Sequence, residues 1–144
     1  MPSDLVTALQ ERARRNLFWR HLGAELEDAG EGWVRLRVTV RDELRNSASR
    51  PVHGGVLASL VDMAVGSALG TMHERSEGGV GQTTLDLNVS FLAGVEGGEV
   101  FAEGRIVKKG KSIAFGEARI TDSTGKLVAI GRATYMVLTP KEGT

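Results

Sequence analysis

Asp62 is the residue whose type and position most directly suggest chemistry. It stands within residues 56–69, a run that is apolar on every side and therefore predicts a buried helix. The side chains three and four positions away on that helix are Ala58, Ser59, Val65 and Gly66. None is a cation that could neutralise the carboxylate, and burying an unpaired carboxylate costs free energy. Asp62 is thus a candidate functional residue, the alternative being a surface acid that water solvates or that Ser59 hydrogen-bonds.

The tripeptide His53-Gly54-Gly55 comes directly before this helix. Two glycines at a loop-to-helix junction let the backbone approach a ligand closely, and the first N–H groups of a helix have no acceptor within it. Such N–H groups can stabilise the negative charge that develops on a carbonyl oxygen under attack. The tripeptide predicts an anion or oxyanion site, with a plain tight turn as the alternative.

The spacing of Gly54 and Asp62 limits how they can cooperate. They are eight residues apart, which corresponds to about 12 Å along a straight helix. A carboxylate that attacks a carbonyl carbon, directly or through water, should lie within roughly 7 Å of the N–H that polarises the carbonyl oxygen. One chain cannot meet this requirement with both residues. If they cooperate, Asp62 meets Gly54 of a second chain, which predicts a homodimer with shared sites.

Other chemistry has less support in the sequence. The chain has no cysteine, so it has neither a thiol nucleophile nor a thiolate metal site. His21 and His73 have no further metal ligands at usable spacing, and no Ser-His-Asp arrangement has local support. We therefore expect no bound metal.

The remaining sequence predicts the elements that hold the apolar helix. Residues 4–22 have apolar side chains at helical spacing and predict an amphipathic helix or two short ones, which pack as a cover. Strands are predicted over residues 24–28, 33–40, 84–91, 99–107, 112–121 and 127–138. In the third of these, Leu85, Leu87, Val89 and Phe91 alternate with polar residues that begin at Thr84, which predicts a half-buried strand.

One long apolar helix among about six strands cannot form a doubly wound parallel sheet, which needs a crossover helix between successive strands. We predict instead an α+β fold in which a curved antiparallel sheet wraps around the helix. The 144 residues are enough for one domain with a substantial core, so residues 1–144 are expected to form a single domain.

Charge and composition exclude several kinds of partner. The formal net charge is zero, with cations and anions interspersed, which argues against binding to nucleic acid or to an anionic membrane. The N-terminal region carries charges throughout, and no apolar run reaches membrane-spanning length without interruption. Together with the absence of cysteine, these features predict a cytoplasmic protein.

The order of these elements, His53-Gly54-Gly55 followed by Asp62, and the strand at 85–91 resemble a known family. It is the hotdog-fold acyl-CoA thioesterases of the phenylacetate-pathway (PaaI-like) type, within the 4-hydroxybenzoyl-CoA thioesterase superfamily. The resemblance covers about residues 22–138 and leaves residues 1–21 as an N-terminal helical extension. It implies that Asp62 is the nucleophile or general base, that the Gly54 N–H polarises the thioester carbonyl from the opposite subunit, and that His53 orients the loop.

The resemblance also implies roles for residues outside the helix. Thr84 matches a hydroxyl that helps to hold the attacking water in some members, and Thr83 is an adjacent, oppositely facing alternative. Many members have an asparagine six residues before the histidine. Ser47 occupies that place here, with Asn46 one residue further away, so Asn46 is either a site residue or a turn residue after a strand.

A basic turn resembles the family segment that lies near the nucleotide end of coenzyme A. Its residues are Lys108, Lys109, Gly110, Lys111 and Ser112. Ammonium groups and backbone N–H groups of such a turn can bind phosphate oxygens, although a lysine-rich hairpin can also be simply solvated.

The resemblance implies an acyl-CoA thioesterase that releases free acid and coenzyme A, with no cofactor apart from the coenzyme A of the substrate. The alternatives are a hotdog dehydratase or hydratase acting on acyl thioesters through His53 and Asp62, and a non-catalytic acyl-CoA-binding protein. Because the outer sheet faces keep apolar residues, we also expect two dimers to pair into a homotetramer. The low aromatic content does not choose between aryl and aliphatic acyl groups.

Overall fold

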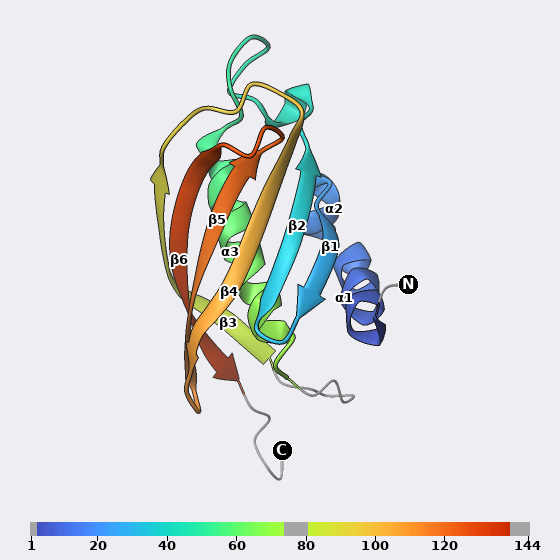
Figure 1. Cartoon of the computed structure of the whole chain (residues 1–144), viewed down its shortest axis with the longest axis vertical. Helices are drawn as coiled ribbons and strands as arrows, with labels where there is room; N and C mark the ends of the chain where they lie inside the picture. The colour runs from blue at the N-terminus through green and yellow to red at the C-terminus, as the bar shows by residue number, and fades with distance from the viewer. Residues whose placement is uncertain (1–2, 74–80, 139–144) are drawn as a thin grey trace.

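The structure is a computed structural model that describes residues 3–73 and 81–138 (Figure 1). Its helices are α1 (Asp4–Arg15), α2 (Leu17–Leu22) and α3 (Gly54–Gly70), with a short 3-10 helix at Asp42–Leu44. Its strands are β1 (Glu25–Gly30), β2 (Trp33–Thr39), β3 (Gly81–Phe91), β4 (Glu99–Lys109), β5 (Ile113–Asp122) and β6 (Leu127–Leu138). The predicted long helix and six strands are all present.

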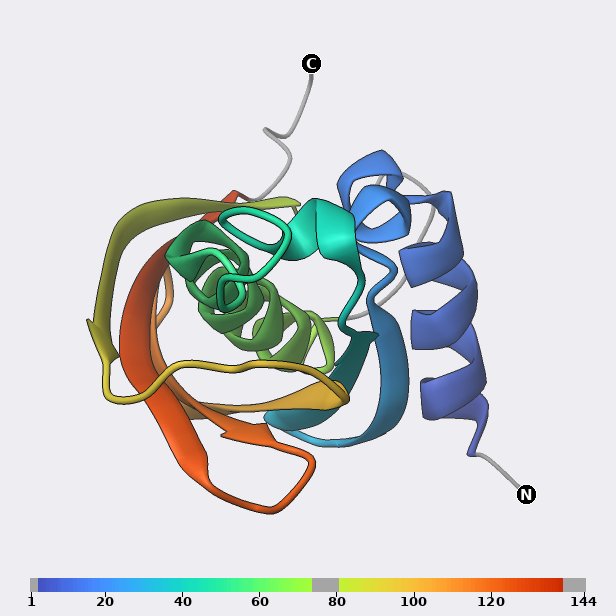
Figure 2. The same cartoon turned by 90° about the horizontal axis from the view of Figure 1, so that it is seen from above.

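The six strands form one antiparallel sheet in the order β1-β2-β4-β5-β6-β3. Seen from above, the sheet curves around α3, which lies against its concave face (Figure 2). This is the predicted α+β hotdog fold. Among the described residues β3 pairs with β6 alone, so its other edge carries unpaired backbone groups.

Small residues in the sheet let α3 approach it closely. Gly104, Ala118 and Gly131 lie opposite one another across β4, β5 and β6. A Cβ atom at Gly104 would lie only 2.5 Å from the backbone carbonyl of Ala64 on α3. Because backbone cannot move aside cheaply, a larger residue at this position would push the helix away from the sheet.

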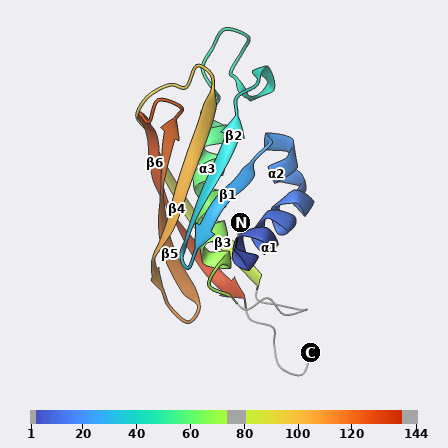
Figure 3. The ribbon, with the colours of Figure 1, turned by 45° about the vertical axis from the view of Figure 1, so that its right-hand side comes forward.

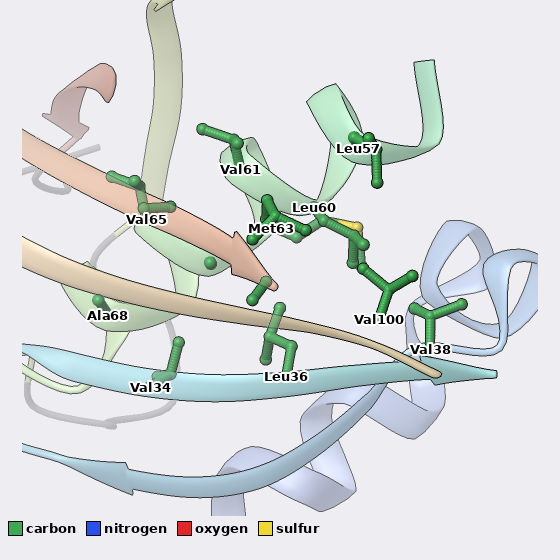
Figure 4. Packing of buried hydrophobic residues seen from close by; sticks show 14 of the residues in the cluster. Val34, Leu36, Val38, Leu57, Leu60, Val61, Met63, Val65, Ala68 and Val100 are labelled. Carbon is green, nitrogen blue, oxygen red and sulfur yellow. The ribbon is translucent and has the colours of Figure 1, made fainter. Parts of the chain in front are cut away.

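The core forms between α3 and the strands of the sheet (Figure 4). The predicted alternation of β2 is confirmed, since Val34, Leu36 and Val38 are at most 1% exposed. Leu60 and Val65 of α3 are buried to the same degree. Each such side chain contributes about 1.5–3 kcal/mol when fully buried. Their burial fixes the rotation of α3 about its axis, and so the direction in which Asp62 points.

The N-terminal residues form two short helices that pack beside β1 (Figure 3). Asn16 ends the first helix, where its backbone N–H donates to the carbonyl of Ala13, and begins the second, where its Oδ1 accepts hydrogen bonds from the backbone N–H groups of Phe18 and Trp19. Trp19 and Leu22 are buried, and Gly23 closes α2 in the left-handed conformation. The two helices form the predicted cover over one side of the α3 layer.

Strand β3 differs from the prediction of a half-buried strand. Leu85 and Phe91 are more than half exposed, because an edge strand is covered from only one side. The pairing with β6 also shifts between Thr84 and Asp86, which makes Leu85 a bulge. A bulge reverses the alternation of side chains, so Thr84 faces the same side of the sheet as Leu87 and not the opposite side.

No helix within residues 3–73 and 81–138 combines the length and apolar character needed to cross a membrane.

Candidate active site

Asp62 lies in the third turn of α3, half-buried, and points toward β3 and β6. Its Oδ1 accepts a hydrogen bond of 2.8 Å from the Thr84 hydroxyl and one of 2.6 Å from the Tyr135 hydroxyl. None of the described side chains donates to the second oxygen, Oδ2. Ser59, the possible local partner, donates instead to the carbonyl of Gly55. The carboxylate is thus held through one oxygen, and the other is available to react.

Thr84 and Tyr135 converge on Asp62 because of the strand register. They lie directly opposite each other on β3 and β6, so their side chains share one face of the sheet. The bulge at Leu85 follows immediately, and it keeps this polar pair on the same face as the apolar residues further along β3. The predicted neighbour, Thr83, lines the same cavity but makes no described side-chain hydrogen bond.

The loop before α3 leaves one backbone donor uncommitted. His53 is the N-cap, and its Nδ1 accepts a 2.8 Å hydrogen bond from the Gly55 N–H. The Val56 N–H donates to the carbonyl of His53. Among the described residues, the Gly54 N–H has no acceptor in the chain. The histidine therefore orders the loop and uses the second N–H of the helix, while the first stays free for a ligand.

A cavity of about 420 Å³ lies beside Asp62, between α3, β3 and the N-terminal helices. Its apolar lining residues include Leu9, Phe18 and Trp19, and its polar ones include Asp62, Thr84 and Tyr135. The predicted cover is therefore also a cavity wall, which the sequence did not indicate. The residues that line the cavity do not include Gly54, His53 or Asn46. One chain therefore does not bring Gly54 to Asp62.

Tyr135 and Gln82 are site residues that the sequence analysis missed. The Gln82 side-chain amide donates to the carbonyl of Gly66, and the Tyr135 hydroxyl also lies 2.8 Å from the carbonyl of Asp62. One signal was present, since Tyr135 is the only tyrosine in the chain and occupies an inward-facing strand position between Ala133 and Val137. A buried tyrosine needs a partner for its hydroxyl.

Asn46 has a local structural contact. Its side-chain amide and its backbone N–H both donate to the carbonyl of Pro51, which closes the exposed loop at residues 47–50. This geometry matches the alternative of a turn residue. Asn46 fixes the segment that enters α3 and does not reach the cavity in its own chain.

The basic turn lies at the far end of α3 from Gly54 (Figure 1). Lys108, Lys109 and Lys111 are exposed around the β4–β5 hairpin. Lys109 lies close enough to His73, beyond the end of α3, to lower the pKa of that histidine, although burial lowers it more. Within one chain, the basic turn and the free Gly54 N–H therefore lie at opposite ends of α3.

No group of three or more His, Cys, Asp or Glu side chains within the described parts of the chain is arranged to hold a metal ion.

Comparison with known proteins gives the family. The family model described as "Thioesterase superfamily" matches residues 51–129, which include the site helix, β3, β4 and β5. The chain belongs to the thioesterase superfamily. The family resemblance drawn from His53-Gly54-Gly55 and Asp62 is thereby confirmed, as is the assignment to thioester hydrolases.

Individual relatives agree with this assignment. The chain is 33% identical over 132 residues to the medium/long-chain acyl-CoA thioesterase YigI of Salmonella typhimurium, covering 83% of this chain and 84% of that protein. The crystal structure of thioesterase HI1161 from Haemophilus influenzae matches with a TM-score of 0.84 at 24% identity, covering 96% of this chain and 94% of that one. The PaaI protein of the E. coli phenylacetic acid degradation operon matches with a TM-score of 0.81 at 20% identity, covering 96% and 99%. At these identities the two structures support the fold alone.

The hydroxyl contact to Asp62 gives a direct comparison of two adjacent threonines. Thr84→Val removes a hydrogen bond to a charged group and is expected to lower thioester hydrolysis about tenfold. Thr83→Val removes a hydroxyl from the same cavity without touching Asp62 and should change the rate less than about twofold. Steady-state rates of both variants test this, and equal losses would contradict the assignment of Thr84 as the partner.

Proposed function

We propose that the protein hydrolyses acyl-CoA thioesters to free acid and coenzyme A at sites shared by the two chains of a homodimer. The observation that carries this proposal is the Asp62 carboxylate, which faces a cavity with Oδ1 held by two hydroxyls and Oδ2 uncommitted. A thioester carbonyl is electrophilic enough for a carboxylate and a backbone oxyanion donor to suffice without a serine triad.

Oδ2 can act on the thioester by either of two routes. As a general base it takes a proton from water while the water oxygen bonds to the carbonyl carbon. The tetrahedral intermediate then breaks its C–S bond, and the thiolate leaves as coenzyme A after taking the proton back from Asp62. As a nucleophile, Oδ2 bonds to the carbonyl carbon itself, expels the thiolate and forms an anhydride that water hydrolyses. Both routes need the carboxylate in its charged form.

The exposed edge of β3 supports a dimer in which Asp62 meets the partner's Gly54. Gly54 lies beside Phe91 at the end of β3, because a Cβ at Gly54 would lie 3.3 Å from the Phe91 ring. Asp62 lies beside Thr84 near the start of that strand. An antiparallel β3–β3 pair about a twofold axis near the middle of this edge, around Leu87 and Asn88, would bring the end of the partner's β3 close to Thr84.

This pairing would also carry the partner's Gly54 to the side of Asp62. The two exposed apolar residues Leu85 and Leu87 would be covered at the same time. The Gly54 N–H, which has no acceptor among the described residues of its own chain, then fits the role of the donor that stabilises the oxyanion. Phe115 and Ile130, exposed on the outer sheet face, are the residues we expect between two such dimers in a homotetramer.

The same twofold arrangement supports a role for the basic turn in binding coenzyme A. An inverted partner brings its Gly54 end to the end of the dimer that carries Lys108, Lys109 and Lys111 of the first chain. Gly110 and Ser112 shape this turn, since the Gly110 N–H donates to the carbonyl of Ile113 and the carbonyl of Ser112 accepts from the Val137 N–H. The lysines are exposed and suited to the phosphates of the nucleotide.

Asp62→Asn tests the proposed chemistry. Asparagine keeps the shape of the side chain but cannot accept the proton or attack the carbonyl, so hydrolysis should fall by roughly two orders of magnitude or more. Release of free thiol from a panel of acyl-CoAs measures the rate, and thermal unfolding checks the fold. Asp28→Asn makes the same chemical change on the exposed strand β1 and should leave the rate unchanged. Near-normal hydrolysis by a folded Asp62→Asn variant would exclude Asp62 as the catalytic carboxylate.

The basic turn is expected to act on binding and not on the chemical step. Replacing Lys108, Lys109 and Lys111 by alanine should raise KM for acyl-CoA about fivefold, more at low salt, and leave kcat nearly unchanged. Lys126→Ala, in the β5–β6 turn, provides a control for loss of an exposed lysine elsewhere. A fall in kcat at constant KM would show that the turn does not bind the nucleotide.

A further inference from the structure

One polar arrangement at the contact between α3 and β6 centres on the Tyr135 hydroxyl. The Tyr135 hydroxyl lies 2.6 Å from Oδ1 and 2.8 Å from the backbone carbonyl of Asp62. It therefore touches both the side chain and the main chain of the same residue. A phenol has one proton, and a carboxylate oxygen is the stronger acceptor of the two.

Gly66 provides the space for this hydroxyl. It lies one helical turn after Asp62, on the same face of α3. A Cβ atom at Gly66 would lie 2.6 Å from the Tyr135 oxygen and 3.1 Å from its Cζ atom. Any other residue would displace the phenol from Asp62. Since a glycine inside a helix is less stable than an alanine, the hydroxyl is accommodated at the expense of helix stability.

We propose that Tyr135 is a positioning residue for Asp62, seated by Gly66, which holds Oδ1 so that Oδ2 faces the substrate. This role rests on the thioester hydrolysis proposed above. Both hydroxyls donate to Oδ1, Thr84 from β3 and Tyr135 from β6. Rotation of the carboxylate would break both hydrogen bonds.

The surroundings support a donor that stays protonated. Burial, and then the hydrogen bond with Asp62, raise the pKa of Tyr135 well above its usual range. The phenol therefore remains a donor wherever Asp62 is charged. Of the described residues lining the cavity, the other charged or titratable group is Arg12 of α1, while the lining residues of α2, β1 and β3 carry no charge.

Steady-state hydrolysis by two variants tests the proposal. Tyr135→Phe removes the hydroxyl and keeps the ring, and Gly66→Ala keeps the hydroxyl but pushes it aside. Each should lower kcat about tenfold and leave KM nearly unchanged, because the charged carboxylate loses a donor that positions it. The double variant should be no worse than either single variant, since both remove the same contact. Arg12→Gln removes the other charge that lines the cavity and serves as a control. It should not lower kcat tenfold at an unchanged KM.

A second readout does not depend on hydrolysis. The NMR chemical shift of the Asp62 carboxyl carbon should differ from that of the unaltered protein in both variants, because the hydrogen bond from Tyr135 to Oδ1 is lost. An unaltered protein without thioesterase activity would refute the proposed function, and this chemical shift would still show whether Tyr135 holds the carboxylate. The proposal is overturned if the variants fold and keep the chemical shift of the unaltered protein, or if they lose only thermal stability. If Tyr135→Phe does not fold, Gly66→Ala alone decides between these outcomes.

Discussion

The site depends on how one carboxylate oxygen is held at the contact between a helix and a sheet. Oδ1 of Asp62 accepts two hydroxyl hydrogen bonds from strands that lie side by side, and neither donor carries a charge. A cation would stabilise the carboxylate more strongly but would also compete with the substrate for its second oxygen. Neutral donors leave Oδ2 free while they limit the cost of a half-buried charge. The chemistry of the site follows from this division between the two oxygens.

The arrangement requires α3 to lie very close to the sheet. A hydroxyl on β6 reaches Asp62 only because Gly66 has no side chain, and β4 and β6 provide Gly104 and Gly131 beneath the same helix. Such close packing leaves little freedom for the helix to rotate or slide. The core residues of α3 and β2 therefore act on function indirectly, since they fix the direction of Asp62. The rigid helix also keeps Gly54 and Asp62 apart, which is the reason for expecting a second chain at the site.

The sequence was sufficient for the fold, and it singled out Asp62 as a candidate, because both depend on local patterns. An apolar helix interrupted by one acid, and strands with period-two alternation, are visible without a structure. The role of Tyr135 was not visible, because it follows from the strand register and from the space that Gly66 leaves 69 residues earlier. The orientation of Thr84 relative to Leu87 was also wrong in the sequence analysis, since a single-residue bulge at Leu85 reverses alternation and has no clear sequence signal here.

The central claim is that each site combines residues of two chains, and mixed dimers test it most directly. Gly54→Val places a side chain against the Phe91 ring and blocks approach to the free N–H, so this variant and Asp62→Asn should each be inactive alone. Refolded together in equal amounts, they should recover about a quarter of the normal activity, because half of the dimers are mixed and each mixed dimer has one complete site. Tagging one of the two chains lets mass measurement confirm that mixed dimers have formed. If these mixed dimers show no activity, the shared site is contradicted.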